Sequence, residues 1–349
     1  MIEHSKPAVG RDELCALKEV IATNYPAEGW AVSKFEHDLS DYIGAKGAVA
    51  TSTGTLALHL ALLCLEIKPG DELILPSYTC RSVLNAVLFM RAEPVLCDVN
   101  IADYNISFQE ARSKVNLRTK AIIIPHMFGC PAEIDKFRNL GVPIIEDCAH
   151  SVGAKYKNRK VGSWGDLSIF SFEGTKYITT GEGGMVLANS RSLLKKLKKL
   201  KEPGSLDYKI KYTYRMTNLQ AALGVVQLSR LSSFISKRRQ VAGLYTKAFS
   251  NLGIELPREP EEGLHIYHRY MIRIKGSIVK LMRDCYKRSI KIKQPVKPYP
   301  LHQYLKLTNK SFPNTELIMK SAVSIPIYPL ITNKEIGLII DTLNKVLAN

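Results

Sequence analysis

Lys176 is the residue with the clearest potential for covalent chemistry. It lies in the stretch SFEGTKYITTGEGG (residues 171–184), between an apolar, strand-like segment and a cluster of glycines. A lysine held in apolar surroundings or beside other cations loses proton affinity and becomes a nucleophile. A lysine at a strand end is otherwise a solvated surface residue, so its role depends on what converges on it. Ser171, at the start of the stretch, could contact a phosphate.

An acidic residue ends another apolar segment. In IIEDCAHSVGA (144–154) the apolar run leads into Glu146 and Asp147. An acid at the end of a buried strand could pair with a protonated ring nitrogen, although Asp also serves as an ordinary helix cap. His150 follows and could lie against a ring, although a single histidine can equally be structural.

The segment TSTGTLALHLAL (51–62) combines a strand end with the start of a helix. Thr53 and Thr55 can cap free backbone N–H groups, and Gly54 lets the backbone approach a ligand closely. Such a helix N-terminus can bind phosphate, although a plain cap without a ligand is the alternative.

A nucleophilic lysine, a buried acid and a helix N-terminus are together the parts of a pyridoxal 5′-phosphate (PLP) site. Two nucleotide-binding motifs are excluded. The sequence GTK is not the GK[ST] of a P-loop, and GEGGMV (181–186) has valine where GxGxxG requires its last glycine.

The elements that must position these residues alternate between strand and helix. Continuous apolar runs, typical of strands covered on both faces, occur at 48–51, 72–75, 94–99, 121–125, 142–147, 166–172 and 183–189. Helix-like stretches such as 55–67 and 82–92 separate some of them. The pattern predicts a doubly wound α/β domain over 1–235 and a smaller α+β domain over 236–349. Ligands of such sheets gather at the carboxyl ends of the strands.

Composition narrows the class of protein. The chain has 349 residues, 46% hydrophobic and 23% charged, with no apolar run long enough for a membrane span. Seven scattered cysteines without a CxxC pair argue against a disulfide framework or a structural zinc site and favour a reducing compartment. We therefore expect a cytoplasmic protein that binds neither metal nor membrane. The net charge of +17 attracts anions, either nucleic acid or phosphorylated metabolites, but no nucleic-acid-binding motif accompanies it.

The motifs, taken in order, resemble the DegT/DnrJ/EryC1/StrS family of sugar aminotransferases. The resemblance spans nearly the whole chain and rests on the segments at 28–62, 68–87, 94–99, 144–154, 165–186, 214–228 and 324–341. It implies the fold-type-I PLP architecture, a mostly parallel seven-stranded sheet with helices on both faces. It also implies that the amino-acid donor is glutamate, that the acceptor is a nucleotide-linked keto-sugar, and that the protein is a homodimer with active sites at the subunit interface.

The resemblance also implies roles for individual residues. Lys176 would bind the cofactor covalently, and Asp147 would keep its ring nitrogen protonated. His150 would lie against the ring, and the phosphate would be held by Thr53, Gly54, Thr55 and Ser171. Related sugar 3-dehydratases carry histidine in place of the lysine, so Lys176 favours transamination.

Three positions depart from the family pattern. Thr213 stands where an asparagine usually reaches the partner subunit's phosphate, and Cys80 stands where many members have a ring-stacking aromatic residue. Tyr78 is a candidate to compensate for that residue. The sugar-side motif survives only in part, as KPYPLH (297–302), where His302 is a candidate substrate contact. Two alternatives remain open: a PLP-binding regulator or scaffold without turnover, suggested by Thr213 and Cys80, and a nucleic-acid-binding protein, suggested by the charge alone.

Overall fold

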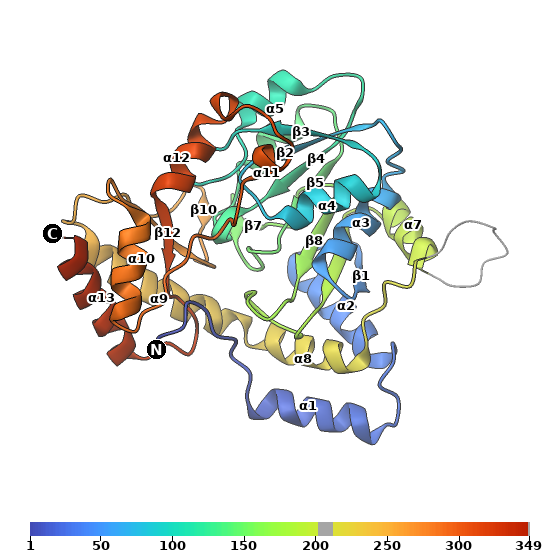
Figure 1. Ribbon diagram of the computed structural model, residues 1–349. Helices are drawn as coiled ribbons and strands as arrows, with labels where there is room; N and C mark the ends of the chain where they lie inside the picture. The colour runs from blue at the N-terminus through green and yellow to red at the C-terminus, as the bar shows by residue number, and fades with distance from the viewer. Residues whose placement is uncertain (202–211, 348–349) are drawn as a thin grey trace.

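The computed structural model describes residues 1–201 and 212–347. A seven-stranded sheet forms its centre (Figure 1), with strand order β1-β9-β8-β5-β4-β2-β3. The strands are β1 (Gly47–Thr51), β2 (Glu72–Pro76), β3 (Glu93–Cys97), β4 (Thr119–Pro125), β5 (Ile144–Asp147), β8 (Leu167–Ser171) and β9 (Gly184–Ala188). Only β9 runs antiparallel to its neighbours β1 and β8, while the other pairs of this sheet are parallel. The predicted, mostly parallel seven-stranded sheet is confirmed.

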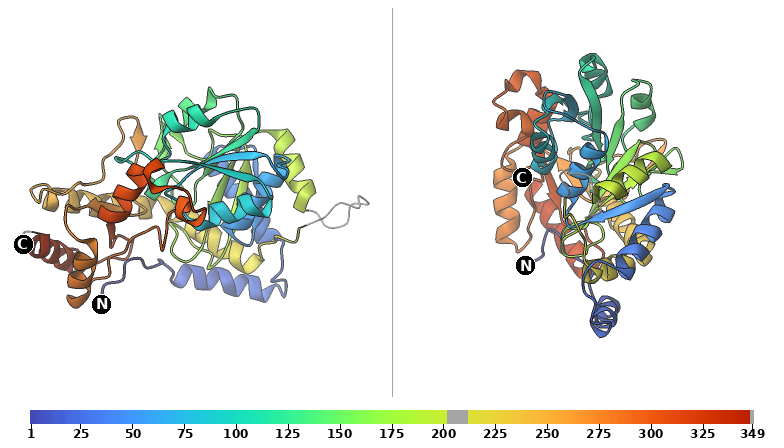
Figure 2. Two further views of the ribbon diagram at one scale, coloured as in Figure 1. Left: turned by 45° about the horizontal axis from the view of Figure 1, so that its top comes forward. Right: turned by 90° about the vertical axis from the view of Figure 1, so that its right-hand side faces the viewer.

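Helices cover both faces of this sheet (Figures 1 and 2). Neighbouring strand residues point to opposite faces, and β4 shows the result: Ile123 packs into one core, whereas Ile122 and Ile124 pack into another. One face carries α3 (Gly54–Cys64), α4 (Arg81–Phe89) and α7 (Arg191–Lys201). The other carries α2 (Trp30–Ile43), α5 (Phe108–Lys114), α6 (Ile134–Arg138) and α8 (Asn218–Ser229), and α1 (Arg11–Ala22) packs on the outside of α8. Continuous apolar strands are the sequence signature of this burial.

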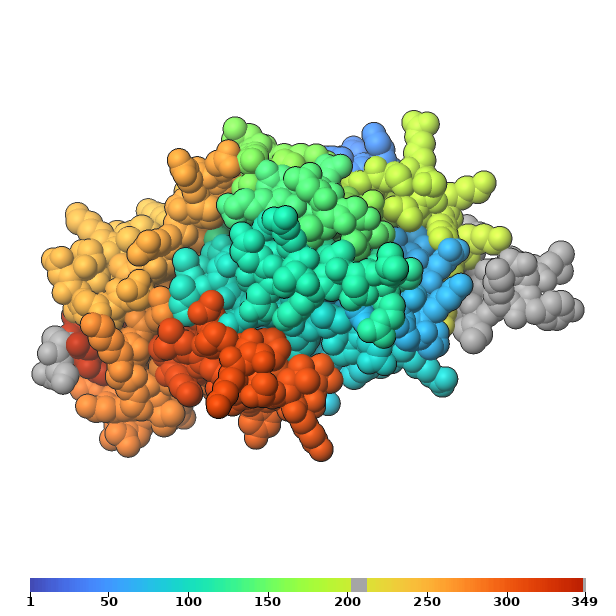
Figure 3. Space-filling model, turned by 90° about the horizontal axis from the view of Figure 1, so that it is seen from above, coloured from blue at the N-terminus to red at the C-terminus, as the bar shows by residue number. Residues whose placement is uncertain are grey.

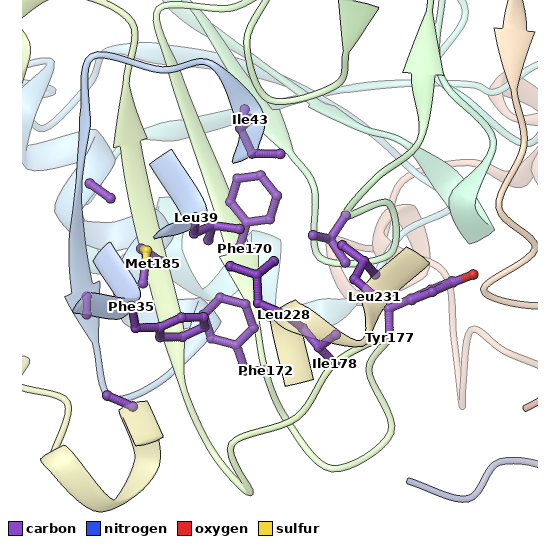
Figure 4. Packing of buried hydrophobic residues seen from close by; sticks show 14 of the residues in the cluster. Phe35, Leu39, Ile43, Phe170, Phe172, Tyr177, Ile178, Met185, Leu228 and Leu231 are labelled. Carbon is purple, nitrogen blue, oxygen red and sulfur yellow. The ribbon is translucent and has the colours of Figure 1, made fainter. Parts of the chain in front are cut away.

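The core beneath the strands that end at the candidate site is aromatic. Figure 4 shows Phe35 and Leu39 of α2 packed against Phe170 of β8 and against Phe172 just beyond it. The rings of Phe35 and Phe172 lie 5.0 Å apart in a tilted arrangement. This packing on one face of the sheet holds the end of β8 in place, directly before the segment that carries Lys176.

A smaller unit contains the C-terminal residues. Its antiparallel pair, β11 (Tyr270–Arg273) and β12 (Ala322–Ile325), packs with α9 (Leu231–Phe249), α10 (Ile278–Lys287) and α13 (Asn333–Leu347). The remaining elements are β6 (Lys155–Tyr156), β7 (Arg159–Lys160), β10 (Gly263–Leu264), α11 (Leu301–Tyr304), α12 (Pro313–Ser321) and the short 3-10 turns η1 (Met127–Gly129) and η2 (Asn309–Ser311).

The two units do not separate at one point of the chain. The expected boundary at residue 235 falls inside α9, whose Leu231 and Phe234 belong to the large core while Tyr245 and Phe249 belong to the small one. Ile2 also packs into the small core, and Leu301 returns to the large one. Figure 3 shows the orange-red segment around α12 lying against the large unit. A composition change along the chain cannot reveal a helix shared by two cores.

Among the described residues, no helix is long and apolar enough to cross a membrane.

Candidate active site

The carboxyl edge of the large sheet holds a cavity of about 310 Å³. It lies where β1, β5 and β8 end, as expected for parallel sheets. Its walls include Thr53, Gly54, Thr55, Thr79, Cys80, Ser82, His126, Asp147, His150, Ser171, Glu173, Lys176 and Glu182. A larger hollow of about 490 Å³, lined by residues such as Arg138 and Asp166, lies at the opposite edge and contains none of the predicted site residues.

Lys176 lies in the loop between β8 and β9 and lines the cavity. Its backbone N–H donates to the carbonyl of Glu173 at 2.8 Å, which fixes the turn that carries it. Within the described part of the chain, its Nζ has no hydrogen bond or ion pair. Burial lowers the pKa of Lys176, while the nearby Cys80 and Asp147 partly offset the shift. The side chain therefore has the environment that a nucleophilic lysine requires.

Asp147 is the last residue of β5 and is 8% exposed. Its Oδ1 accepts a hydrogen bond from the N–H of Ala149 at 3.0 Å, and no other partner of the carboxylate is found in the described residues. Burial raises the pKa of Asp147, against the opposing effects of that N–H and of Lys176. A cation beside the unpaired carboxylate oxygen would offset the free-energy cost of keeping the buried carboxylate charged. A protonated ring nitrogen is such a cation.

The segment after β1 forms the phosphate-binding candidate. Thr53 caps α3, and its Oγ1 accepts from the N–H of Leu56 at 3.2 Å. The N–H groups of Gly54 and Thr55 donate to no group of the described chain and point out of the first turn of α3. Gly54 must be glycine here, because a Cβ would lie 2.6 Å from the Cβ of Ser171. The close contact brings Ser171 and the helix N-terminus together, as a phosphate site requires.

His150 lines the same cavity with its ring in contact with two others. The ring of His268 lies nearly parallel at 4.5 Å, and that of Phe128 lies nearly parallel at 5.9 Å. Burial, with Lys176 and Arg269 nearby, holds the pKa of His150 well below its ordinary value. The histidine is therefore a neutral ring at the cavity wall.

Two predicted substrate contacts lie elsewhere. His302 is fully buried, with Nδ1 2.6 Å from Ser77 Oγ and Nε2 3.0 Å from Glu316 Oε1. Tyr78 is also fully buried and does not line the cavity, because it packs beside Tyr104 and Phe128. The geometry of the single chain therefore supports neither a substrate contact by His302 nor compensation by Tyr78 for the missing aromatic residue. Tyr78 follows β2 and His302 lies in α11, but both side chains are buried away from the cavity.

Of the positions that depart from the family pattern, Cys80 lies at the cavity and Thr213 lies away from it. Cys80, the N-cap of α4, lines the cavity and is exposed. Thr213 is exposed and does not line the cavity of this chain.

Sequence reasoning missed several cavity residues. Glu173 and Glu182 lie in the same quoted stretch as Lys176, so their proximity could have been noticed. His126 reaches Glu146 at 2.9 Å, and Glu146 also accepts from the N–H groups of Gly162, Trp164 and Gly165, each at 2.7 Å. Glu146 therefore ties the loop after β7 to β5 and supports the Asp147 position from within.

Comparisons with known proteins agree with this geometry. Residues 7–344 match the DegT/DnrJ/EryC1/StrS aminotransferase family. The chain is 33% identical to GDP-perosamine synthase of Escherichia coli O157:H7, over 91% of each chain. It is 30% identical to the spore coat polysaccharide biosynthesis protein SpsC of Bacillus subtilis, over 99% of this chain and 97% of that one. Its fold matches the aminotransferase TlmJ of Streptoalloteichus hindustanus with a TM-score of 0.91 and 28% identity, covering 100% of this chain and 99% of that one.

Proposed function

Because the chain belongs to the DegT/DnrJ/EryC1/StrS aminotransferase family, we propose that this PLP-dependent sugar aminotransferase transfers the amino group of glutamate to a nucleotide-linked keto-sugar. The observation that carries the proposal is the single cavity shared by Lys176, Asp147 and the 53–55 segment. No other described cavity combines a buried acid, a free lysine amine and an open helix N-terminus.

The residues present fit the cofactor. Lys176 would bind it covalently, and Asp147, a buried carboxylate that needs a counter-ion, would face its ring nitrogen. Thr53, Gly54, Thr55 and Ser171 would hold the phosphate at the first turn of α3. When bound, PLP supplies a ring that accepts the electrons left on a carbon that loses a proton.

Lys176 would also carry the proton that transamination moves. Burial lowers the pKa of Lys176, which increases the fraction of its amine that is unprotonated and able to accept a proton. In the first half-reaction Nζ, released when the amino group of glutamate takes its place, would take the proton from Cα of glutamate. In the second it would deliver a proton to the sugar carbon that receives the amino group. One flexible side chain at the cavity wall can serve both carbons, because each occupies the same place in turn.

Asp147 would act as a fixed counter-charge. Its carboxylate is held in place by the N–H of Ala149 at the end of a buried strand, so it needs no reorganisation during the reaction. His150 would contact the cofactor as a neutral group and add no second positive charge beside the ring nitrogen.

The nucleotide-linked substrate is proposed from two observations. The relatives at 33–35% identity include GDP-perosamine synthases, whose name specifies a nucleotide-linked amino sugar. The net charge of +17 also favours a substrate with a diphosphate. All seven cysteines are free, which supports the proposed cytoplasmic location.

We also propose a homodimer whose interface completes the site. Thr213 is exposed, as a residue directed at a partner subunit must be, and it belongs to the segment directly before α8. Cys80, at the exposed N-terminus of α4, leaves one wall of the cavity accessible. Sedimentation velocity should show a dimer at micromolar concentration, and a monomer that keeps full activity would contradict this part of the proposal.

The proposal is tested by supplying purified protein with PLP, glutamate and a panel of GDP-, UDP- and dTDP-linked keto-sugars. We expect multiple turnovers, detected as an amino sugar by mass spectrometry with matching formation of 2-oxoglutarate. Binding of PLP without turnover on any member of the panel would favour the non-catalytic regulator instead.

The phosphate site gives a prediction of its own. Gly184→Ala should weaken PLP binding about tenfold or more, because the new Cβ would lie 2.2 Å from the carbonyl oxygen of Thr53 and would displace the 53–55 segment. Gly174→Ala is the matched control, since its Cβ would meet nothing within 4 Å. Absorbance titration with PLP measures both. Equal affinities for the two variants would remove the 53–55 segment from the binding site.

A further inference from the structure

A second histidine stands behind the cavity wall. His268 lies between β10 and β11 and is 1% exposed, and its ring lies 4.5 Å from that of His150 at an interplanar angle of 16°. It does not line the cavity itself. His268 therefore covers one face of the His150 ring, and the Phe128 ring lies nearly parallel to His150 at 5.9 Å. An occupant of the cavity would meet the remaining part of the His150 ring, which lines the cavity.

Buried groups hold the backbone of His268 in place. Nη1 of Arg238, an arginine only 2% exposed, donates to the carbonyl oxygens of His268 at 3.2 Å and Ile327 at 2.7 Å. The guanidinium of Arg238 also lies over the ring of Tyr177 at 4.7 Å, and the Tyr177 hydroxyl donates to the carbonyl of Ile266 at 2.9 Å. Since Tyr177 directly follows Lys176, the same contacts tie the His268 segment to the loop that carries the lysine.

The charges around the stacked pair are positive. Lys176, Arg238 and Arg269 all act on His268, and Lys176 and Arg269 act on His150. Arg269 itself contacts the ring of His4 at 3.1 Å. Two acids lie nearby: Asp147 and Glu173 act on the pKa of Lys176, and Glu173 also acts on the pKa of Arg269. A proton on either imidazole would therefore be repelled by these cations, and a second proton on the pair would also face a like charge in a ring only 4.5 Å away.

We propose that His268 is a positioning residue for the reaction: its stacked ring holds His150 in a fixed plane and in the neutral form, so that His150 meets the bound cofactor with an uncharged ring. This inference rests on the proposed function, since it assumes that PLP occupies the cavity. A neutral imidazole keeps one nitrogen as an acceptor and one as a donor. It also leaves Asp147 to neutralise the ring nitrogen without competition from a second cation.

Burial explains why the pair stays neutral. Both His150 and His268 have a pKa well below the ordinary value, first because of desolvation and then because of the neighbouring cations. Across pH 5 to 8, where an ordinary histidine titrates, His150 should not change its charge. Loss of the His268 ring would open space beside His150, hydrate it and allow it to titrate in that range.

The test is a double-mutant cycle with PLP affinity and absorbance as readouts. His268→Ala should raise the PLP dissociation constant about tenfold in the wild-type background and less than about twofold in the His150→Ala background, because the effect acts through His150. The absorbance of the bound cofactor should gain an ionisation between about pH 5 and 7 in His268→Ala that is missing from the double variant. His268→Phe, which keeps a stacked ring, should restore most of the affinity.

His265→Ala is the matched control. His265 belongs to the same segment, is 3% exposed and stacks on Tyr267 at 4.1 Å, but it does not line the cavity or contact His150. It should lose thermal stability and keep the wild-type affinity for PLP. An equal loss of affinity from His268→Ala in both backgrounds, or the same loss from His265→Ala, would overturn the proposal. Because PLP binding is measured without any sugar, a failure of the proposed transamination would not be mistaken for a failure of this inference.

Discussion

Lys176→Ala should abolish the visible absorbance of lysine-bound PLP and lower turnover by about 10²- to 10⁴-fold or more, the range of a lost proton transfer alone. The expected loss is large because Lys176 would serve twice, as the covalent attachment and as the proton carrier, and no second lysine among the described residues lines the cavity. PLP should still bind, more weakly, through the 53–55 segment and Asp147.

Lys160→Ala provides the matched control for this result. Lys160 is another partly buried lysine whose pKa is lowered by burial, but its Nζ donates to the carbonyl of Tyr42, away from the cavity. It should retain the wild-type spectrum and rate. Wild-type turnover in Lys176→Ala would show that the cavity is not the site of amino transfer, whatever the family resemblance suggests.

Asp147→Asn should lower turnover about 10²- to 10³-fold, the typical effect of removing one preorganised electrostatic group. Asparagine keeps the size of the side chain and can still accept the hydrogen bond from Ala149, so the change removes mainly the charge. Without a counter-ion, the ring nitrogen of the cofactor would lose its proton and accept electrons less well. Asp166→Asn, at the opposite edge of the sheet, should leave the rate unchanged.

The same substitution should stabilise the protein when PLP is absent. Burial raises the pKa of Asp147 in the folded state, so the folded protein holds this proton to higher pH than the unfolded chain does. The stability of the wild type must therefore fall as pH rises through the folded-state pKa. Asp147→Asn avoids that loss, and its advantage in melting temperature should be present at pH 8 and vanish near pH 3.

Addition of PLP should reverse the order of stability. A bound protonated ring would pair with Asp147 in the wild type but not in Asp147→Asn, so the wild type should gain more in melting temperature. If the wild type were more stable than Asp147→Asn at pH 8 in the absence of PLP, the Asp147 carboxylate would not be a buried charge that lacks a counter-ion.

The strands of the sheet could be predicted because each one is encoded by consecutive residues of a single segment. Continuous apolar runs such as 121–125 indicate strands buried on both faces, and the structure has β4 at Thr119–Pro125. The residues that end these strands then meet at one edge without further information. Lys176, Asp147, Thr53 and Ser171 accordingly line one cavity, as the sequence predicts.

Residues brought to the site from distant segments could not be predicted in the same way. His268 reaches His150 only because Arg238 and Tyr177 fix a turn between the two units, and no periodicity encodes that contact. His302 shows the opposite case, since a histidine in a functional motif is used here to bridge Ser77 and Glu316 in the core. Motif position predicts proximity to a site, but hydrogen-bond partners decide which way a side chain points.

The measurement that tests the central claim most directly is the absorbance spectrum of the purified protein with one equivalent of PLP, before and after glutamate is added. We predict a visible band that requires Lys176 and that glutamate replaces with the near-ultraviolet band of pyridoxamine phosphate, with one 2-oxoglutarate formed per site. A wild-type protein that binds no PLP, or whose lysine-bound band does not respond to glutamate or to any other amino acid, would contradict the account.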